Sequence, residues 1–162
     1  MKKFVVISII GILVFSAASL LAQRGAADLP DLIVSKIEFQ KVHSGKDSDG
    51  HTYWVFNVII TIKNQGKGDA GPFDVLLERN NGAGKAFQTA CQTCTLHVLR
   101  IIAGGEKTLE PRVFNIANDA PSSFRVTADS GKAVNEGNEM NNQKTETFFS
   151  LTPSLSSTIR GN

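Results

Sequence analysis

The sequence predicts an all-β protein built as a two-sheet antiparallel sandwich. From Asp31 onward the apolar residues recur mainly at every second position, and helical spacing is not sustained over any long window. About seven β-type runs alternate with segments rich in Gly, Asn, Asp and Pro. Short strands separated by turn-forming residues are typical of a sandwich in which each strand buries one face.

The first run, residues 31–39 (DLIVSKIEF), changes the phase of its alternation. Leu32 and Val34 belong to one phase, whereas Ile37 and Phe39 belong to the other. A one-residue bulge, or a switch between sheets, reconciles the two phases. We therefore predict such an irregularity near the middle of this run.

The run from 52 to 64 (TYWVFNVIITIKN) is the longest strand that the sequence predicts. Its core face consists of five side chains at alternate positions: Trp54, Phe56, Val58, Ile60 and Ile62. Val55 and Ile59 are apolar exceptions on the opposite face. We expect Trp54 to lie in the core because its in-phase neighbours are apolar, which leaves Tyr53 as the better candidate for surface contact.

Five further runs complete the strand pattern. After the turn-forming stretch QGKGDAGP they are FDVLLER, TLHVLRII, TLEPRVFNI, SSFRVTAD and KTETFFSL. Pro111 interrupts TLEPRVFNI, and proline cannot donate a ladder hydrogen bond, so this strand is predicted to lie at a sheet edge or to bend.

The segment KDSDGH (46–51) resembles the opening of a calcium loop, with Asp47 and Asp49 at alternate positions. The twelfth position of such a loop is a glutamate, but Val58 stands there. Asp-Gly between two β-runs is more typical of a hairpin turn, which is the interpretation we favour.

The N-terminal segment has the three parts of a secretory signal peptide. Lys2 and Lys3 precede an uncharged stretch, Phe4 to Gln23, with an apolar run and then small residues. We predict cleavage after Ala22, with Ser19 as the second choice, and export to the periplasm, the cell surface or the medium. An uncleaved anchor is the alternative, since ~20 apolar residues span a bilayer, and membrane contact is expected only in that case.

These features divide the chain into four parts. They are a signal peptide (1–22), a lead-in (23–29), a β-sandwich domain (30–151) and a flexible C-terminal tail (152–162). Removal of the signal peptide lowers Lys+Arg from 17 to 15, against 15 Asp+Glu, so the mature chain is about neutral. No cluster of basic and aromatic residues is present, and we expect no nucleic-acid partner.

Cys91 and Cys94 are the only cysteines. In an exported protein they meet an oxidising compartment, so a local disulfide is predicted. A redox-active pair would need a strand-to-helix context, which a β-rich chain does not offer. Metal binding together with His97 would need a fourth ligand from His43 or His51.

Four blocks, PDLIVSKIEF, VIITIKNQGKGDAGPFDVLL, IIAGGEKTLEPRV and FRVTADSGKAVNEGNEMNN, occur in this order. Together they resemble the CARDB domain, the cell-adhesion-related domain found in bacteria. The resemblance covers roughly residues 30–150 and implies an immunoglobulin-like sandwich of seven strands that serves adhesion or binding without catalytic residues. The segment between Asn80 and Arg100 is enlarged relative to the family pattern.

The stretch AVNEGNEMNNQ (133–143) concentrates polar residues between two β-runs. Asn and Asp side chains bond to nearby backbone amides and tolerate left-handed conformations, so a structural turn is predicted, with Val134 facing inward. Two roles stay open for its glutamates, namely charge at the solvent edge and weak cation binding. The residues assigned to structural turns are Asn64, Gly66, Asp129, Glu136, Asn138, Glu139, Asn141 and Asn142.

The expected function is that of a non-enzymatic binding, adhesion or envelope-assembly module that acts through loops or an exposed strand edge. Its expected partner is a protein or an envelope or extracellular polymer. No hydrolase, zinc-protease or phosphate-loop motif is present, so no catalytic residue or cofactor is assigned. Two alternatives stay open: a secreted thiol-disulfide protein using the cysteine pair, and a calcium-stabilised module using Asp47, Asp49 and the late acidic stretch.

Overall fold

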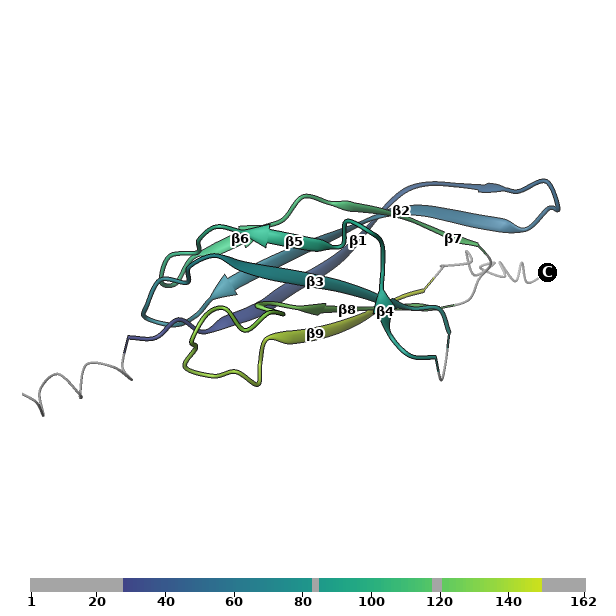
Figure 1. Ribbon diagram of the computed structural model, residues 1–162. Helices are drawn as coiled ribbons and strands as arrows, with labels where there is room; N and C mark the ends of the chain where they lie inside the picture. Colours follow the sequence, from purple (N-terminus) through teal and green to yellow (C-terminus); the bar gives the residue numbers. More distant parts are fainter. Residues whose placement is uncertain (1–27, 83–84, 118–120, 150–162) are drawn as a thin grey trace, which may run out of the picture.

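The computed structural model describes residues 28–82, 85–117 and 121–149 (Figure 1). The predicted signal peptide, most of the lead-in and the C-terminal tail lie outside these residues. The strands are β1 (Leu32–Lys46), β2 (Thr52–Asn64), β3 (Phe73–Asn80), β4 (Gln88–Thr89), β5 (Thr95–Val98), β6 (Glu106–Thr108), β7 (Arg112–Ala117), β8 (Ser122–Thr127) and β9 (Gln143–Phe148). Seven of them have four residues or more, in agreement with the predicted count.

The strands form two antiparallel sheets that face each other (Figure 1). In the first sheet β2 is central, with β1 on one side and both β6 and β7 on the other. In the second sheet β3 pairs with β4 and β5 on one side and with β8 on the other, and β9 follows β8 at the edge. The predicted all-β sandwich is confirmed. Within the described ranges no helix is long and apolar enough to cross a membrane.

The core lies between the sheets and follows the period-two pattern. Phe56, Val58, Ile60 and Ile62 of β2 are buried. They face buried side chains of the second sheet, namely Phe73, Val75, Leu77, Phe124 and Val126. Each such side chain contributes about 1.5–3 kcal/mol to folding by leaving water. At one side of the core, the rings of Phe56 and Phe148 stack with centroids 4.2 Å apart.

The predicted irregularity in the first strand is a β-bulge. Val34 pairs with Ile62 and Lys36 pairs with Thr61, so Ser35 is the extra residue. The bulge shifts the alternation by one position, which allows Val34 and Ile37 both to face the core. The bend expected at Pro111 is also present, because TLEPRVFNI is divided into β6 and β7.

The hairpin of β1 and β2 extends past the ends of the strands in the second sheet (Figure 1). At its tip, Oδ1 of Asp47 accepts hydrogen bonds from the backbone N–H groups of Asp49 (3.0 Å) and His51 (2.8 Å). Gly50 has φ +83°, the left-handed region that glycine adopts easily. The segment 46–51 is therefore a hairpin turn, as predicted.

Candidate functional site

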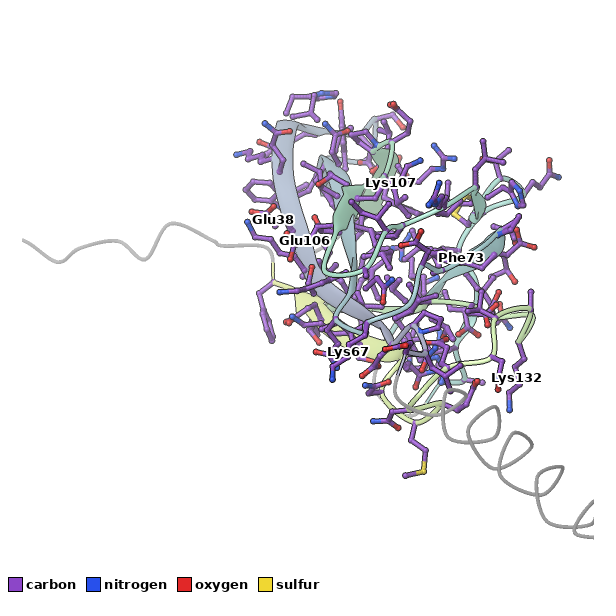
Figure 2. The ribbon with its side chains drawn as sticks, turned by 90° about the vertical axis from the view of Figure 1, so that its left-hand side faces the viewer. Glu38, Lys67, Phe73, Glu106, Lys107 and Lys132 are labelled. Carbon is purple, nitrogen blue, oxygen red and sulfur yellow. A yellow bond between two sulfur atoms is a disulfide. The ribbon has the colours of Figure 1, made fainter. Side chains whose placement is uncertain are left out.

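Four chain segments meet at the end of the sandwich opposite the hairpin tip. They are residues 28–31, the β2–β3 link (65–72), the β5–β6 link (99–105) and the β8–β9 link (128–142). Figure 2 views the molecule from this end, with Lys67 of the β2–β3 link and Lys132 of the β8–β9 link labelled. All eight residues assigned to structural turns lie at this end.

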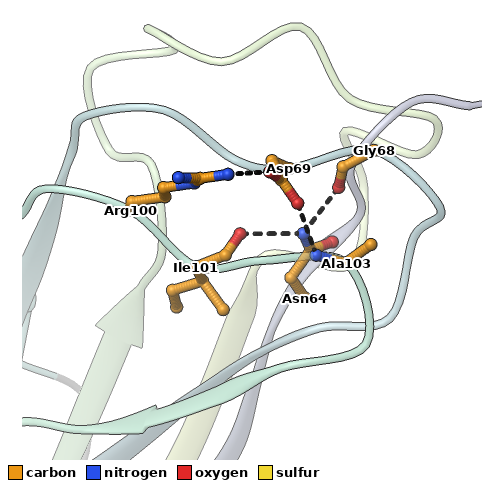
Figure 3. A network of polar contacts seen from close by, with 6 residues as sticks. All are labelled: Asn64, Gly68, Asp69, Arg100, Ile101 and Ala103. Atoms are coloured by element: carbon orange, nitrogen blue, oxygen red, sulfur yellow. Dashed lines mark hydrogen bonds and ion pairs between the residues drawn. The ribbon is translucent and has the colours of Figure 1, made fainter.

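Asn64, at the end of β2, is fully buried and uses all four of its hydrogen-bonding positions. Its Oδ1 accepts from the backbone N–H groups of Asp31 (3.0 Å) and Gly66 (3.1 Å). Its Nδ2 donates to the carbonyl oxygens of Gly68 (2.8 Å) and Ile101 (3.2 Å), as Figure 3 shows. One side chain therefore joins three of the four segments.

Asp69 ties the β2–β3 link to the β5–β6 link on the solvent side of Asn64 (Figure 3). Its carboxylate accepts hydrogen bonds from the guanidinium of Arg100 and from the backbone N–H of Ala103, the latter at 2.9 Å. The bond from Arg100 is the main reason why the pKa of Asp69 lies below its usual value. This ion pair is exposed to water, which screens it.

Asp129 opens the β8–β9 link in a left-handed conformation, with φ +46°. Its buried carboxylate accepts from the backbone N–H groups of Ala133 (2.8 Å, Oδ1) and Val134 (2.9 Å, Oδ2). Val134 is buried in the core, so the expectation that it faces inward is confirmed. Asp129 thus closes the turn that brings Val134 into the sandwich.

Glu136 corrects one expectation, because its side chain is only 6% exposed and does not lie at the solvent edge. Oε2 accepts from the backbone N–H of Leu32 and Oε1 accepts from Nδ2 of Asn142. Burial raises the pKa of Glu136 to about 6, although both hydrogen bonds oppose this shift. Glu139 does lie at the surface, where its Oε1 accepts from the backbone N–H of Glu136 (3.1 Å).

Asn138 and Asn141 of the β8–β9 link also bond within the chain. Oδ1 of Asn138 accepts from the backbone N–H of Met140 at 3.0 Å, and Nδ2 of Asn141 donates to Oδ1 of Asp31 at 2.8 Å. The polar groups at this end therefore hold the loops to one another and to the start of β1.

The structure does not assemble the hypothetical calcium site from Asp47, Asp49 and the late acidic stretch. The two aspartates lie in the hairpin turn after the last residue of β1, whereas Glu136 contacts its first residue. At about 3.3 Å per residue, a strand of 15 residues separates them by about 45–50 Å. In the part of the chain that the structure describes, no three His, Cys, Asp or Glu side chains are placed to hold a metal ion.

Cys91 and Cys94 form the predicted disulfide, in a turn immediately before β5. The backbone N–H of Cys94 donates to the carbonyl of Cys91 (3.2 Å), and the carbonyl of Cys94 accepts from the N–H of Leu77 in β3 (2.9 Å). Cys94 is completely buried in the core. This strand–turn–strand context differs from the helix N-terminus that lowers the pKa of a redox-active thiol.

An aromatic groove of about 270 Å³ lies where the β1–β2 hairpin leaves the second sheet. It is lined by Phe39, Lys41, Trp54, Phe148 and Phe149. The ammonium nitrogen of Lys41 lies 4.0 Å from the ring centroid of Trp54, a cation–π contact. The groove thus combines four aromatic rings with one cation.

The expectation that Trp54 lies in the core is therefore wrong. Trp54 is only partly buried and lines the groove, because β2 continues beyond the facing sheet. Tyr53 instead packs across the hairpin against Gly45, where an added Cβ would lie 2.7 Å from the tyrosine hydroxyl. The period-two pattern shows which face Trp54 occupies, but not where the opposing sheet ends.

Comparison with known proteins identifies the family. The CARDB family model matches residues 29–146, which confirms the resemblance inferred from the four sequence blocks. A search of curated proteins found no match.

Two solved structures share the fold. The crystal structure of the CARDB domain of a Pyrococcus furiosus protein, in complex with di-metal ions, has a TM-score of 0.52 and 21% identity, covering 76% of this chain and 90% of that one. A solution structure of a domain described as part of a cell surface protein from Methanosarcina acetivorans has a TM-score of 0.50 and 21% identity. The match covers 76% of this chain and 94% of that one. At these identities the likeness shows the fold alone.

Proposed function

The chain belongs to the CARDB family, and from this premise we propose that it is an exported, non-enzymatic binding module whose contact site is the aromatic groove. The N-terminal sequence pattern supports export to the periplasm, the cell surface or the medium. A partner protein or an extracellular polymer would be held by surface complementarity, since the immunoglobulin-like fold specifies no chemistry of its own.

The observation that carries this proposal is the exposure of apolar aromatic surface at the groove. Phe149 is 65% exposed, and Trp54 and Phe148 are only partly buried. Aromatic side chains dominate the binding energy of protein interfaces because they bury a large rigid area. By contrast, Asn64 at the loop end already uses all four of its hydrogen-bonding positions within the chain.

The disulfide supports a role without thiol chemistry. Cys91 and Cys94 are joined to each other, so neither offers a thiolate nucleophile.

The proposal is tested with a neutral aromatic dye, N-phenylnaphthylamine, titrated into the mature protein. Trp54 is the single tryptophan of the chain, so quenching of its emission reports binding at the groove itself. We expect saturable quenching in the native protein. Phe149→Ser should weaken binding about two- to tenfold, because an aromatic contact is worth about 0.5–1.5 kcal/mol.

Leu99→Ser is the matched control, since Leu99 is 70% exposed and is not among the residues that line the groove. It should bind the dye as the native protein does. The proposal fails if the native protein does not quench, or if the two variants lose affinity equally.

A further inference from the structure

The chemistry of the groove limits what it can hold. Its lining side chains are four aromatic rings and the Lys41 ammonium, with no carboxylate, amide or hydroxyl group among them. The lining fits an apolar group that is accompanied by a single charge.

The charge on the bound group should be negative, because the groove is lined by Lys41, a cation that has no carboxylate partner in the described part of the chain. The neighbouring lysines of the two bordering strands are paired, Lys36 with Glu38 (2.8 Å) and Lys144 with Glu146 (3.5 Å). Among the described residues no carboxylate lies within 4.0 Å of Lys41, whose ammonium rests on the Trp54 ring. An anion beside Lys41 would therefore complete an ion pair without displacing an existing one.

The strands that border the groove favour an extended peptide as the ligand that supplies both the apolar group and the negative charge. Phe39 and Lys41 belong to β1 and Phe148 belongs to β9, and each of these strands is the last in its sheet among the described residues. Edge strands present unpaired backbone N–H and C=O groups, to which an extended segment can add by main-chain hydrogen bonds.

From these observations we propose that the groove binds an extended acidic segment of a partner protein, which places one large apolar side chain among the aromatic rings and a carboxylate beside Lys41. This inference rests on the proposed function and specifies the partner of the same site. The aromatic rings supply affinity through buried area, and Lys41 selects among apolar segments by charge.

The test uses two capped eight-residue peptides of threonine and valine that differ at one position, one with a central Phe-Thr-Glu sequence and one with Phe-Thr-Gln, because side chains two positions apart share a face of an extended strand. Each is titrated at low salt against the native protein, with Trp54 emission and displacement of the bound dye as readouts. We expect the native protein to prefer the Glu peptide about two- to fivefold, the range of an exposed ion pair. The preference should disappear at high salt.

Lys41→Met is the diagnostic variant, because it keeps an unbranched side chain over Trp54 and removes the charge. It should bind both peptides equally, with the affinity that the native protein has for the Gln peptide. Equal binding of the two peptides by the native protein, or a preference that survives in Lys41→Met, would overturn the inference.

Dodecanoate, below its micelle-forming concentration, serves as a lipid-like competitor. If it displaces the dye and neither peptide does, the groove takes a lipid chain and the peptide inference is wrong. Dye binding without displacement by either peptide leaves the proposed function standing and removes the inference. If the dye itself does not bind, both fail.

Discussion

The carboxylate of Glu136 accepts a hydrogen bond from the backbone N–H of Leu32, a residue 104 positions earlier in the chain. This bond joins the β8–β9 link to the first residue of β1, the strand whose far end forms the projecting hairpin. An unpaired amide buried at the start of a strand would cost about 1–3 kcal/mol. The buried glutamate removes that cost but carries a desolvation penalty of its own.

The penalty makes stability depend on pH. The pKa of Glu136 rises from its ordinary value of 4.5 to about 6, mainly because burial disfavours the charged form. Because the pKa of Glu136 is higher in the folded protein than in the unfolded chain, protonation of this side chain stabilises the fold. This contribution is complete below about pH 4.5 and is lost as the pH rises through 6, a loss of about 2 kcal/mol.

Glu136→Gln should remove this dependence, because glutamine is neutral and keeps an oxygen for the Leu32 amide. Oδ1 of Asn142 is buried without a partner in the described structure. If the side-chain amide of Asn142 flips, this oxygen can accept a hydrogen bond from the new glutamine N–H. Urea unfolding across this pH window is the measurement, with Glu110→Gln as control, because Glu110 is exposed and its charge is not among the causes of the raised pKa of Glu136. Parallel pH profiles for the native protein and Glu136→Gln would refute the assignment.

Gly66→Ala should destabilise the loop end of the sandwich. A Cβ at this position would lie 2.5 Å from the backbone nitrogen of Asp31 and 2.6 Å from the carbonyl carbon of Pro30. Backbone atoms cannot yield as a flexible side chain can, so we expect a cost of about 1–3 kcal/mol in thermal or urea unfolding.

Gly71→Ala, in the same β2–β3 link, is the control because nothing lies within 4 Å of its added Cβ. Its stability should stay within about 0.5 kcal/mol of the native value. Equal losses in the two variants would mean that chain flexibility, rather than close approach to residues 30–31, makes glycine necessary at position 66.

Reduction of the disulfide should lower stability only moderately and leave the fold intact. Cys91 and Cys94 are three positions apart, so the ring restricts little of the unfolded chain, and loop-closure entropy gives about 2 kcal/mol. Urea unfolding with and without reductant measures the difference, and far-ultraviolet circular dichroism checks the strands. The variant with alanine at both positions should not respond to reductant. Loss of the β-spectrum on reduction would contradict this expectation.

Much of the fold could be predicted from local pattern because strand alternation and turn chemistry act over a few residues. The bulge at Ser35 was visible as a phase change, and the bend at Pro111 follows from a missing N–H. The hairpin turn at Asp47 and the disulfide likewise involve groups within four positions of one another. The family was predictable because several such blocks occur in a specific order.

The candidate site was less predictable, since it depends on distances that the chain does not encode locally. Glu136 stands among exposed polar residues, and nothing beside it indicates that its carboxylate bonds to Leu32. Similarly, the apolar neighbours of Trp54 place it on the core face of β2. That face is covered only as far as the second sheet extends.

The sequence by itself determined the all-β class, the strand faces, the turns, the cysteine pairing and the membership of the CARDB family, because period-two alternation and turn residues express backbone geometry directly. Only the tertiary structure decided which polar groups are buried and which aromatic rings remain open to solvent. Burial depends on what packs opposite a residue, and for Trp54 and Phe149 the opposing surface ends, leaving the groove beside Lys41.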